Sequence, residues 1–382
     1  MKVALVHDWL TGMRGGEYVL EAIAELFPKS DLFTLIQVPG AISPILSTLK
    51  IHKSWLQKVP QAEKRYRYFL PLMPQMIDRF DLTGFDLVIS SSHCVAKGIR
   101  KAPGAVHVSY VHAPMRYIWD RYEDYFGPGR AKFPVRLAAA AVRKRLQDWD
   151  KSVSTAERVD AMVGNSEYIA RQLRELYGRD AKVIYPFAEQ SRFTKPRLPG
   201  KCYLMVGAFA PNKRVDLAIE AFTRLKLPLL IVGSGPGQKA LKKIAGPTID
   251  FLGSLSNAAI ADLYSKCRAF VFPGKDDFGI TPVEAMASGA PVIAFGEGGA
   301  CETVTPQTGV LFTPQTVEAL MEAVQKIETG AVVFSEADCR TRAALFTRER
   351  FQREFVGVVR EAWAAAGKDP APLEELLSKG WA

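Results

Sequence analysis

Short apolar runs alternate with amphipathic segments along the chain. In the first half the apolar runs occupy residues 2–8, 85–92, 105–114 and 160–166, and a helical pattern at 16–28 follows the first of them. The second half repeats this alternation more regularly, from residue 202 to residue 299. Short apolar runs separated by helical segments are typical of parallel strands that are covered by helices on both faces. The pattern predicts an α/β fold with doubly wound parallel sheets.

The chain of 382 residues is longer than one hydrophobic core usually supports, which favours two domains. Residues 185–201 are rich in proline and basic residues and lack periodicity, so we interpret them as the linker. The predicted domains are residues 1–185 and 186–364, and a proline-broken tail, 365–382, is free to pack back on the first. Ligands of such sheets bind beyond the carboxyl ends of the strands, so the loops there are the candidate sites.

One of these loops places two carboxylates around a glycine and a proline. In the stretch VFPGKDDFGITPVEAMASGAPVIAFGEGG the acids are Asp276 and Glu284. Thr281 through Glu284 has the form of a capping box for a helix over 282–288, which is one interpretation of Glu284. Asp276 has an alternative interpretation as part of a solvated turn.

The position of this loop favours a binding site instead. It leads from a strand into a helix N-terminus, where free backbone N–H groups attract anions. A second glycine-rich loop, GEGGACE, follows the next strand and ends at Glu302. Carboxylates beside an anion site are suited to accept hydrogen bonds from hydroxyl groups. A ligand that carries both phosphates and hydroxyls is a nucleotide sugar.

The segment DDFGITPVEAMASGAPVIAFGEGG resembles the donor-site signature of retaining glycosyltransferases of the GT-B fold, family four. That signature has two acidic residues separated by seven others, as Asp276 and Glu284 are. The resemblance extends over nearly the whole chain, through HDWLTGMRGGE, YVHAPMRYIWD, VGNSEYIA and VGAFAPNKRVDLAIEAF. HAPMRYIWD is most similar to bacterial mannosyltransferases that build O-antigen and exopolysaccharide units.

This resemblance implies a GT-B fold, in which two Rossmann-like domains face a cleft. It implies that Glu284 binds the ribose hydroxyls and that Asp276 holds donor-sugar hydroxyls near the reacting carbon. The other donor-binding candidates in these loops are Phe278, Gly279, Ile280, Thr281 and Glu302. The family usually has Glu where this chain has Asp276, and commonly has Arg where it has Ala208.

Two cations, Lys213 and Arg214, begin a predicted helix, the end at which the helix dipole disfavours positive charge. A bound diphosphate between them would remove this conflict, and a solvated surface pair is the alternative. Arg214 is a candidate to replace the arginine that the family has at the position of Ala208.

In the first half, His112 ends a strand, and the resemblance implies that it faces the reacting end of the donor. His107 has no such counterpart, and we interpret it as structural. Gly15 and Gly16, in GMRGGE, open a helix and can bring backbone close to phosphate or sugar. A plain strand-to-helix turn is the alternative. The motif GSGPGQ has Gln238 in place of the third glycine of a dinucleotide fingerprint, which argues against an NAD site.

The net charge of +10 favours an anionic partner. Residues 64–80 and 132–149 combine basic with apolar side chains, which suits an anionic membrane surface, although a solvated basic helix face is the alternative. No nucleic-acid-binding module is recognised, so we expect no nucleic-acid partner. The first apolar run breaks too early for a signal peptide, and no run of about 18 apolar residues exists. The five cysteines contain no C-x-x-C pair, which indicates reduced thiols.

The sequence therefore predicts a glycosyltransferase that moves mannose from GDP-mannose, with retention, to a saccharide on a polyprenyl diphosphate. We expect no cofactor and no required metal, and a cytoplasmic protein bound peripherally to the inner face of the cytoplasmic membrane. A UDP- or ADP-sugar donor remains open. So do a glycoside hydrolase that uses the two carboxylates and a non-catalytic nucleotide-sugar-binding protein.

Overall fold

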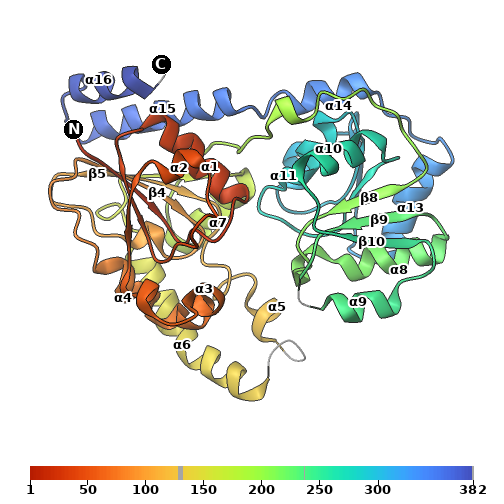
Figure 1. Ribbon diagram of the computed structural model, residues 1–382, viewed down its shortest axis with the longest axis horizontal. Coiled ribbons are helices and arrows are strands. Elements are labelled where there is room, and N and C mark those ends of the chain that lie inside the picture. The colour runs from red at the N-terminus through yellow and green to blue at the C-terminus, as the bar shows by residue number, and fades with distance from the viewer. Residues whose placement is uncertain (128–131, 236, 381–382) are drawn as a thin grey trace. The chain divides into compact units, whose positions relative to one another are not determined.

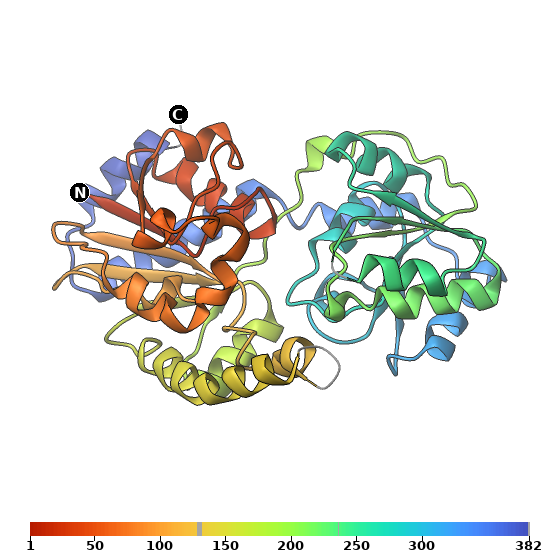
Figure 2. The same cartoon turned by 60° about the horizontal axis from the view of Figure 1, so that its bottom comes forward.

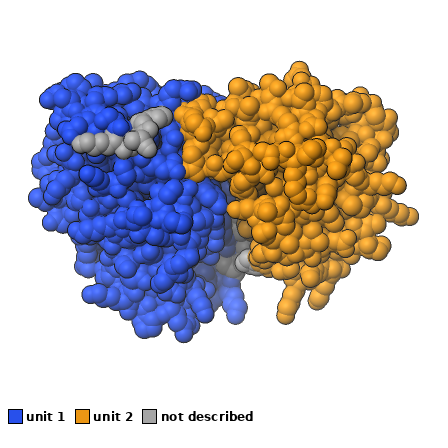
Figure 3. Space-filling model, turned by 45° about the horizontal axis from the view of Figure 1, so that its top comes forward, with its two compact units in different colours: residues 1–185, 351–382 blue, residues 186–350 orange. Residues whose placement is uncertain are grey.

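The computed structural model describes residues 1–127, 132–235 and 237–380. These form two compact units, coloured separately in Figure 3. The N-terminal unit comprises residues 1–185 and 351–382, and the C-terminal unit comprises residues 186–350.

The N-terminal unit is built on a seven-stranded parallel sheet with the order β3-β2-β1-β4-β5-β6-β7. Figure 1 labels β4 and β5 of this sheet. Its strands are β1 Val3–His7, β2 Asp31–Thr34, β3 Lys50–Lys53, β4 Leu87–Ser92, β5 Val106–Val111, β6 Ala161–Gly164 and β7 Lys182–Val183. The predicted apolar runs correspond to β1, β4, β5 and β6. The sequence analysis missed β2, β3 and β7, which are short.

Helices cover both faces of this sheet. They are α1 Gly15–Leu26, α2 Pro44–Ser47, α3 Ala62–Arg65, α4 Met73–Asp78, α5 Tyr122–Phe126, α6 Phe133–Ser152, α7 Glu167–Tyr177, α15 Arg348–Ala365 and α16 Ala371–Gly380. Short 3₁₀ helices are η1 Trp55–Lys58, η2 Tyr66–Leu72 and η3 Ala96–Gly98. Figure 2 shows α6, in yellow, on the opposite side of the sheet from α15, in blue.

The C-terminal unit has a six-stranded parallel sheet with the order β10-β9-β8-β11-β12-β13. Its strands are β8 Tyr203–Val206, β9 Leu229–Val232, β10 Ile249–Gly253, β11 Phe270–Phe272, β12 Val292–Phe295 and β13 Gly309–Phe312. Its helices are α8 Val215–Leu225, α9 Gln238–Ile244, α10 Asn257–Lys266, α11 Ile280–Ala287, α12 Ala300–Thr303, α13 Val317–Glu328 and α14 Glu336–Ala343, with 3₁₀ turns η4 Gln190–Arg192 and η5 Pro211–Lys213.

The end of the chain differs from the predicted domain boundary at residue 364. Helix α15 belongs to the N-terminal unit from Phe351 onward, so residues 351–364 do not form part of the C-terminal domain. The Phe351 ring lies 5.5 Å from the ring of Tyr110 on β5, and Phe351 and Phe355 are fully buried. Burial of these rings against β5 holds α15 on the N-terminal sheet.

The predicted linker is also more ordered than its composition indicates. After residue 185 the chain packs along the end of α10 in the C-terminal unit. Arg197 donates hydrogen bonds to the carbonyl oxygens of Tyr264, Cys267 and Arg268 at 2.8–3.3 Å. The backbone N–H of Leu198 donates to the Ser265 carbonyl at 3.0 Å. Backbone hydrogen bonds of this kind leave no periodic pattern in a sequence.

Both sheets reverse their strand order at one point, between β1 and β4 in the first and between β8 and β11 in the second. A crevice forms at such a switch point, beyond the carboxyl ends of the strands, and is where open α/β sheets bind ligands. The candidate residues lie at these two points.

Candidate active site

In the C-terminal unit, the loops after β8 and β11 bring Lys213 and Asp276 together. The Lys213 ammonium forms an ion pair with the Asp276 carboxylate, and Asn212 Nδ2 donates to Asp276 Oδ1 at 3.0 Å. The close approach requires glycine at 274, because a Cβ there would lie 2.3 Å from the Asn212 carbonyl oxygen. Asn212 is a contact that the sequence analysis missed.

The second glycine-rich loop packs directly against the first. Asp276 and Gly298 form a parallel β-bridge, and the Gly299 N–H donates to the Asp276 carbonyl at 2.9 Å. A Cβ at Gly299 would lie 2.3 Å from Phe278 Cα. The backbone of Asp276 is therefore held by the second loop, while its side chain stays partly exposed, at 16%.

Helix α11 does not begin with the predicted capping box. Its N-cap is Gly279, in the left-handed conformation with φ +84°, and its first helical residue is Ile280. Thr281 and Pro282 therefore lie inside the first turn, and Glu284 is the fifth helical residue. Since a side chain at that position is too far along to cap the N-terminus, the cap interpretation of Glu284 is wrong.

Glu284 is instead held by two side chains of the same unit. Arg192 Nη1 lies 3.5 Å from Oε1, and the Tyr264 hydroxyl donates to Oε2 at 3.3 Å. Burial raises the pKa of Glu284, while the positive charge of Arg192 opposes that shift. The carboxylate is thus mostly buried, with its side chain 14% exposed, and is oriented by Arg192 and Tyr264.

The two predicted cations differ in their contacts. Lys213 reaches Asp276, whereas Arg214 binds Asp216 at 3.2–3.3 Å and donates to Gln315 Oε1 at 3.0 Å. Arg214 is the N-cap of α8 in the left-handed conformation, with φ +50°. No described contact joins Arg214 to Asp276, so the structure pairs the carboxylate with Lys213.

Two other donor-binding candidates, Phe278 and Glu302, lie in surroundings that the sequence did not predict. The Phe278 side chain is buried, with its ring 5.6 Å from that of Phe346, so it belongs to the core of the unit. Glu302 lies in the short helix α12, partly exposed, and its carbonyl accepts a hydrogen bond from Arg342 at 2.5 Å. Of these two, only Glu302 presents a polar side chain.

In the N-terminal unit, three polar residues at the switch point of the sheet contact one another. His7 ends β1, Ser91 lies on β4, and His112 follows β5. His7 Nδ1 lies 3.1 Å from Ser91 Oγ, which lies 2.8 Å from His112 Nε2. Burial lowers the pKa of His7 to about 3 and the pKa of His112 well below its usual value. Both rings are therefore neutral at physiological pH.

The glycines that open α1 differ in their surroundings. A Cβ at Gly16 would lie 3.6 Å from His112 Nε2 and 3.7 Å from His7 Cε1, whereas one at Gly15 would meet nothing within 4 Å. A side chain at position 16 would therefore begin in ordinary van der Waals contact with both rings, whereas position 15 faces open space.

A buried carboxylate that the sequence analysis did not single out holds the neighbouring loop. Asp8, immediately after β1, accepts hydrogen bonds from the backbone N–H groups of residues 93–96 at 2.6–3.0 Å. His93 in this loop lies 5.5 Å from His7 and 6.3 Å from His112, measured between ring centroids. Asp8 therefore fixes His93 beside the other two histidines.

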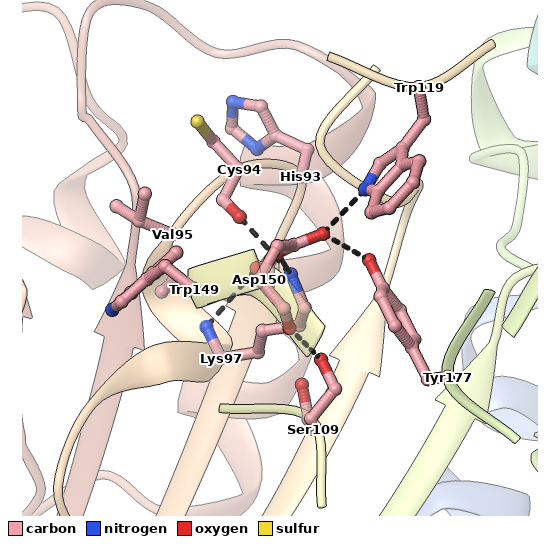
Figure 4. A network of polar contacts seen from close by, with 12 residues as sticks. His93, Cys94, Val95, Lys97, Ser109, Trp119, Trp149, Asp150 and Tyr177 are labelled. Atoms are coloured by element: carbon pink, nitrogen blue, oxygen red, sulfur yellow. Dashed lines mark hydrogen bonds and ion pairs between the residues drawn. The ribbon is translucent and has the colours of Figure 1, made fainter. Parts of the chain in front are cut away.

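A second buried carboxylate, Asp150 of α6, connects Lys97, in the segment after His93, with Trp119 (Figure 4). Asp150 and Lys97 are fully buried and form an ion pair. The other carboxylate oxygen accepts from Trp119 Nε1 at 2.7 Å and from the Tyr177 hydroxyl at 2.5 Å. Lys97 closes the loop after β4 and Trp119 follows His112 by seven residues, so Asp150 fixes both segments.

Glu17, also near this site, makes stability depend on pH. Its Oε2 accepts from the Arg14 backbone N–H at 3.1 Å, and burial raises its pKa from 4.5 to about 7. Between these values the folded state keeps a proton that the unfolded state loses, so the free energy of unfolding falls as pH rises through this window. Above it the contribution is constant.

We expect Glu17→Gln to remove this slope and to raise stability at pH 8 by about 2 to 3 kcal/mol. Urea unfolding between pH 5 and pH 8 measures the effect. The control is Glu63→Gln, which changes an exposed glutamate of α3 and should leave the slope in place. A wild-type curve that is flat across this pH range would contradict the role of Glu17.

Comparison with known proteins assigns both halves of the chain. Residues 15–192 match the family described as Glycosyltransferase Family 4, and residues 187–344 match the family described as Glycosyl transferases group 1. The chain belongs to the GT-B glycosyltransferases. Sucrose-phosphate synthase from Thermosynechococcus elongatus shares this fold, with a TM-score of 0.71 over 96% of this chain and 100% of that chain, at 21% identity.

Two curated relatives of this GT-B glycosyltransferase are named as mannosyltransferases. A GDP-mannose-dependent alpha-mannosyltransferase of Mycolicibacterium smegmatis is 40% identical over 120 residues, which cover 31% of this chain and 32% of that protein. The O-antigen chain mannosyltransferase C of Escherichia coli is 25% identical over 217 residues, which cover 52% and 57%. This glycosyltransferase thus matches between a third and three fifths of the length of these relatives.

Proposed function

We propose that the chain is a retaining glycosyltransferase that moves mannose from GDP-mannose to a saccharide carried by a polyprenyl diphosphate. The observation that carries this proposal is the contact between Lys213 and Asp276 at the switch point of the C-terminal sheet. In this proposal Lys213 would serve as the cation for a leaving diphosphate, and the adjacent Asp276 would serve as the carboxylate for the sugar. The names of both mannosyltransferase relatives support the choice of mannose, and the name of the Mycolicibacterium smegmatis relative supports the choice of GDP.

The residues of the C-terminal unit would have separate roles in this reaction. Lys213 and the backbone N–H groups of Gly279 to Thr281, at the N-terminus of α11, would stabilise the charge that grows on the leaving diphosphate. Glu284 would accept hydrogen bonds from the ribose hydroxyls. Asp276 would hold sugar hydroxyls as the reacting carbon becomes cationic.

We expect GDP to stabilise the protein more than UDP or ADP in a thermal-shift panel of nucleoside diphosphates and their sugars. A ligand at about 100 times its dissociation constant adds about 2.7 kcal/mol to stability. The panel is run with EDTA, because a diphosphate bound by Lys213 and a helix N-terminus does not require a metal.

The matched variants for this panel lie at the two ends of α8. Lys213→Met, just before the helix, should abolish most of the shift, and Lys226→Met, at its C-cap, should retain it. A response to UDP alone would contradict the mannose donor. Loss of the GDP response in EDTA would contradict a metal-free site.

The acceptor proposal rests on a surface of the N-terminal unit. At the start of α6, the side chains of Phe133, Val135 and Leu137 are 72%, 47% and 63% exposed, and Lys132 beside them is exposed. In the basic segment 64–80, Tyr68 is 82% exposed. Across the described parts of the chain, no helix has the length and apolar character needed to span a bilayer. We propose that this surface docks peripherally on the inner face of the cytoplasmic membrane, where it meets the lipid-linked acceptor.

We expect the protein to sediment with phosphatidylglycerol vesicles and to be released as salt rises, because ions screen the attraction to an anionic surface. Phe133→Ser with Leu137→Ser should lower the membrane partition coefficient about 100-fold or more, since each side chain contributes about 1.5 kcal/mol or more when buried and a factor of ten corresponds to about 1.4 kcal/mol. Val333→Ser, which changes an 86% exposed residue of the C-terminal unit, is the control. Equal binding to neutral phosphatidylcholine vesicles would contradict the proposal.

A further inference from the structure

Two adjacent serines of β4 hydrogen-bond to histidines on opposite faces of the N-terminal sheet. Ser91 contacts His7 and His112, and Ser90 contacts His107 Nε2 at 2.8 Å. Successive side chains of a strand point to opposite faces, so the two arrangements cannot exchange partners. Both serines are fully buried. The sheet therefore contains one serine–histidine contact at the candidate site and a matched one away from it.

The protons of the His7–Ser91–His112 chain are limited in number. A neutral imidazole has one N–H and one bare nitrogen, and a hydroxyl has one O–H that it can donate. Ser91 can donate to only one of the two rings, so the other ring must donate to Ser91 for both contacts to be hydrogen bonds. The tautomer of His112 is thus coupled to the tautomer of His7.

The remaining nitrogen of His7 decides between the two arrangements. His7 Nε2 is buried and has no hydrogen-bond partner among the residues that the structure describes. If Ser91 donated to His7 Nδ1, the proton of His7 would lie on Nε2 as a buried donor without an acceptor. Such a donor is rarer and costs more free energy than a buried acceptor without a donor. If His7 Nδ1–H donates to Ser91, and Ser91 donates to His112 Nε2, the one donor that the described residues leave without a partner is His112 Nδ1–H, on a side chain that is partly exposed.

We propose that Ser91 and His7 are positioning residues that hold His112 in the tautomer with its proton on Nδ1. Within the described residues, nothing hydrogen-bonds to His112 Nδ1, and the side chain is partly exposed. His112 then presents a fixed, partly exposed N–H donor, which is suited to a hydroxyl oxygen of a sugar ligand. This inference rests on the proposed function for the identity of the ligand.

A neutral donor is suited to this reaction for an electrostatic reason. The sugar carbon becomes cationic in the transition state, and a charged imidazolium beside it would oppose that charge. A neutral ring with a fixed N–H orients the sugar without adding positive charge. Loss of the Ser91 hydroxyl would leave the His112 ring in place but allow both of its tautomers.

The test uses histidine labelled with ¹⁵N in the full-length protein, which has only five histidines. Long-range proton–nitrogen correlation spectra distinguish a protonated Nδ1 from a protonated Nε2. We expect His112 of the wild type to carry its proton on Nδ1, and Ser91→Ala to give a mixture or the Nε2 form. Ser91→Thr, which keeps the hydroxyl, should restore the wild-type spectrum.

The kinetic readout is the release of GDP from GDP-mannose. Ser91→Ala should lower kcat about tenfold, equivalent to one hydrogen bond of roughly 1.4 kcal/mol, with the donor KM changed less than about twofold. Ser90→Ala removes an equally buried serine and should lower thermal stability similarly without changing kcat.

Two results would overturn the inference. One is a wild-type spectrum with the His112 proton on Nε2. The other is an equal kcat for Ser91→Ala and Ser90→Ala in an enzyme whose wild type is active. If the wild type releases no GDP, the proposed function fails, and the spectra of the unliganded protein still decide the tautomer.

Discussion

Asp276→Asn is expected to lower turnover about 100-fold or more and to leave the affinity for GDP nearly unchanged. The carboxylate lies at the switch point of the C-terminal sheet, in contact with Asn212 and Lys213. Removal of one preorganised group that stabilises transition-state charge typically costs a factor of 10² to 10³. Since we place Asp276 at the sugar, the nucleotide should bind much as before. GDP affinity by calorimetry and GDP release from GDP-mannose separate the two quantities.

Three further variants calibrate this result. Asp276→Glu introduces the residue that family-four glycosyltransferases usually have at this position, and it should keep activity. Asp277→Asn changes the neighbouring carboxylate and should have little effect. Glu284→Gln should weaken donor binding by about 1 to 2 kcal/mol, because a charge-assisted hydrogen bond becomes a neutral one. If the Asp276→Asn variant turned over at the wild-type rate, the carboxylate would have no role at the sugar and Asp276 would only form part of a turn.

Asp150→Ala is expected to lower the free energy of unfolding by about 3 to 5 kcal/mol. The substitution leaves the Lys97 ammonium buried without its partner and removes the acceptor for Trp119 and Tyr177. An isolated buried charge is far more costly than the ion pair itself is stabilising. Urea unfolding measures the loss.

The matched control is Asp148→Ala in the same helix. Asp148 is 57% exposed and pairs with Lys144 across one helical turn, so its removal should cost less than about 0.5 kcal/mol. The double variant Lys97→Met with Asp150→Leu should recover much of the stability, because it removes both charges. Equal losses for Asp148→Ala and Asp150→Ala would show that the buried pair has no special weight.

The sequence predicted the strands that are buried on both faces, because such strands are continuous apolar runs. It failed at the sheet edges, where β3 consists of Lys50 to Lys53 and lacks an apolar run. The unit to which α15 belongs was also beyond prediction. The amphipathic pattern of that helix shows that it packs, but its partner, Tyr110, is more than 200 residues away in the chain.

The candidate site shows the same division. The loops after the strands pointed to Asp276, Glu284 and Lys213, because their chemistry and their position agree. The helix start was misjudged, because the left-handed Gly279 begins α11 earlier than the Thr–Pro–Val–Glu pattern indicates. Asn212 and Ser91 act only through contacts made in the folded chain.

Asp8 had a signal in the sequence, since a charged residue directly after a buried strand interrupts an apolar run. It marks the carboxyl end of β1, where it binds the backbone of residues 93–96.

The most direct test of the central claim follows the anomeric proton of mannose by NMR while the protein releases GDP from GDP-mannose in water. This measurement needs no acceptor. GDP-mannose is an α-linked donor, so a retaining enzyme should produce α-mannose first, with the β anomer growing in only by mutarotation. Release of β-mannose first, or no release of GDP above that of the Asp276→Asn variant, would contradict the account.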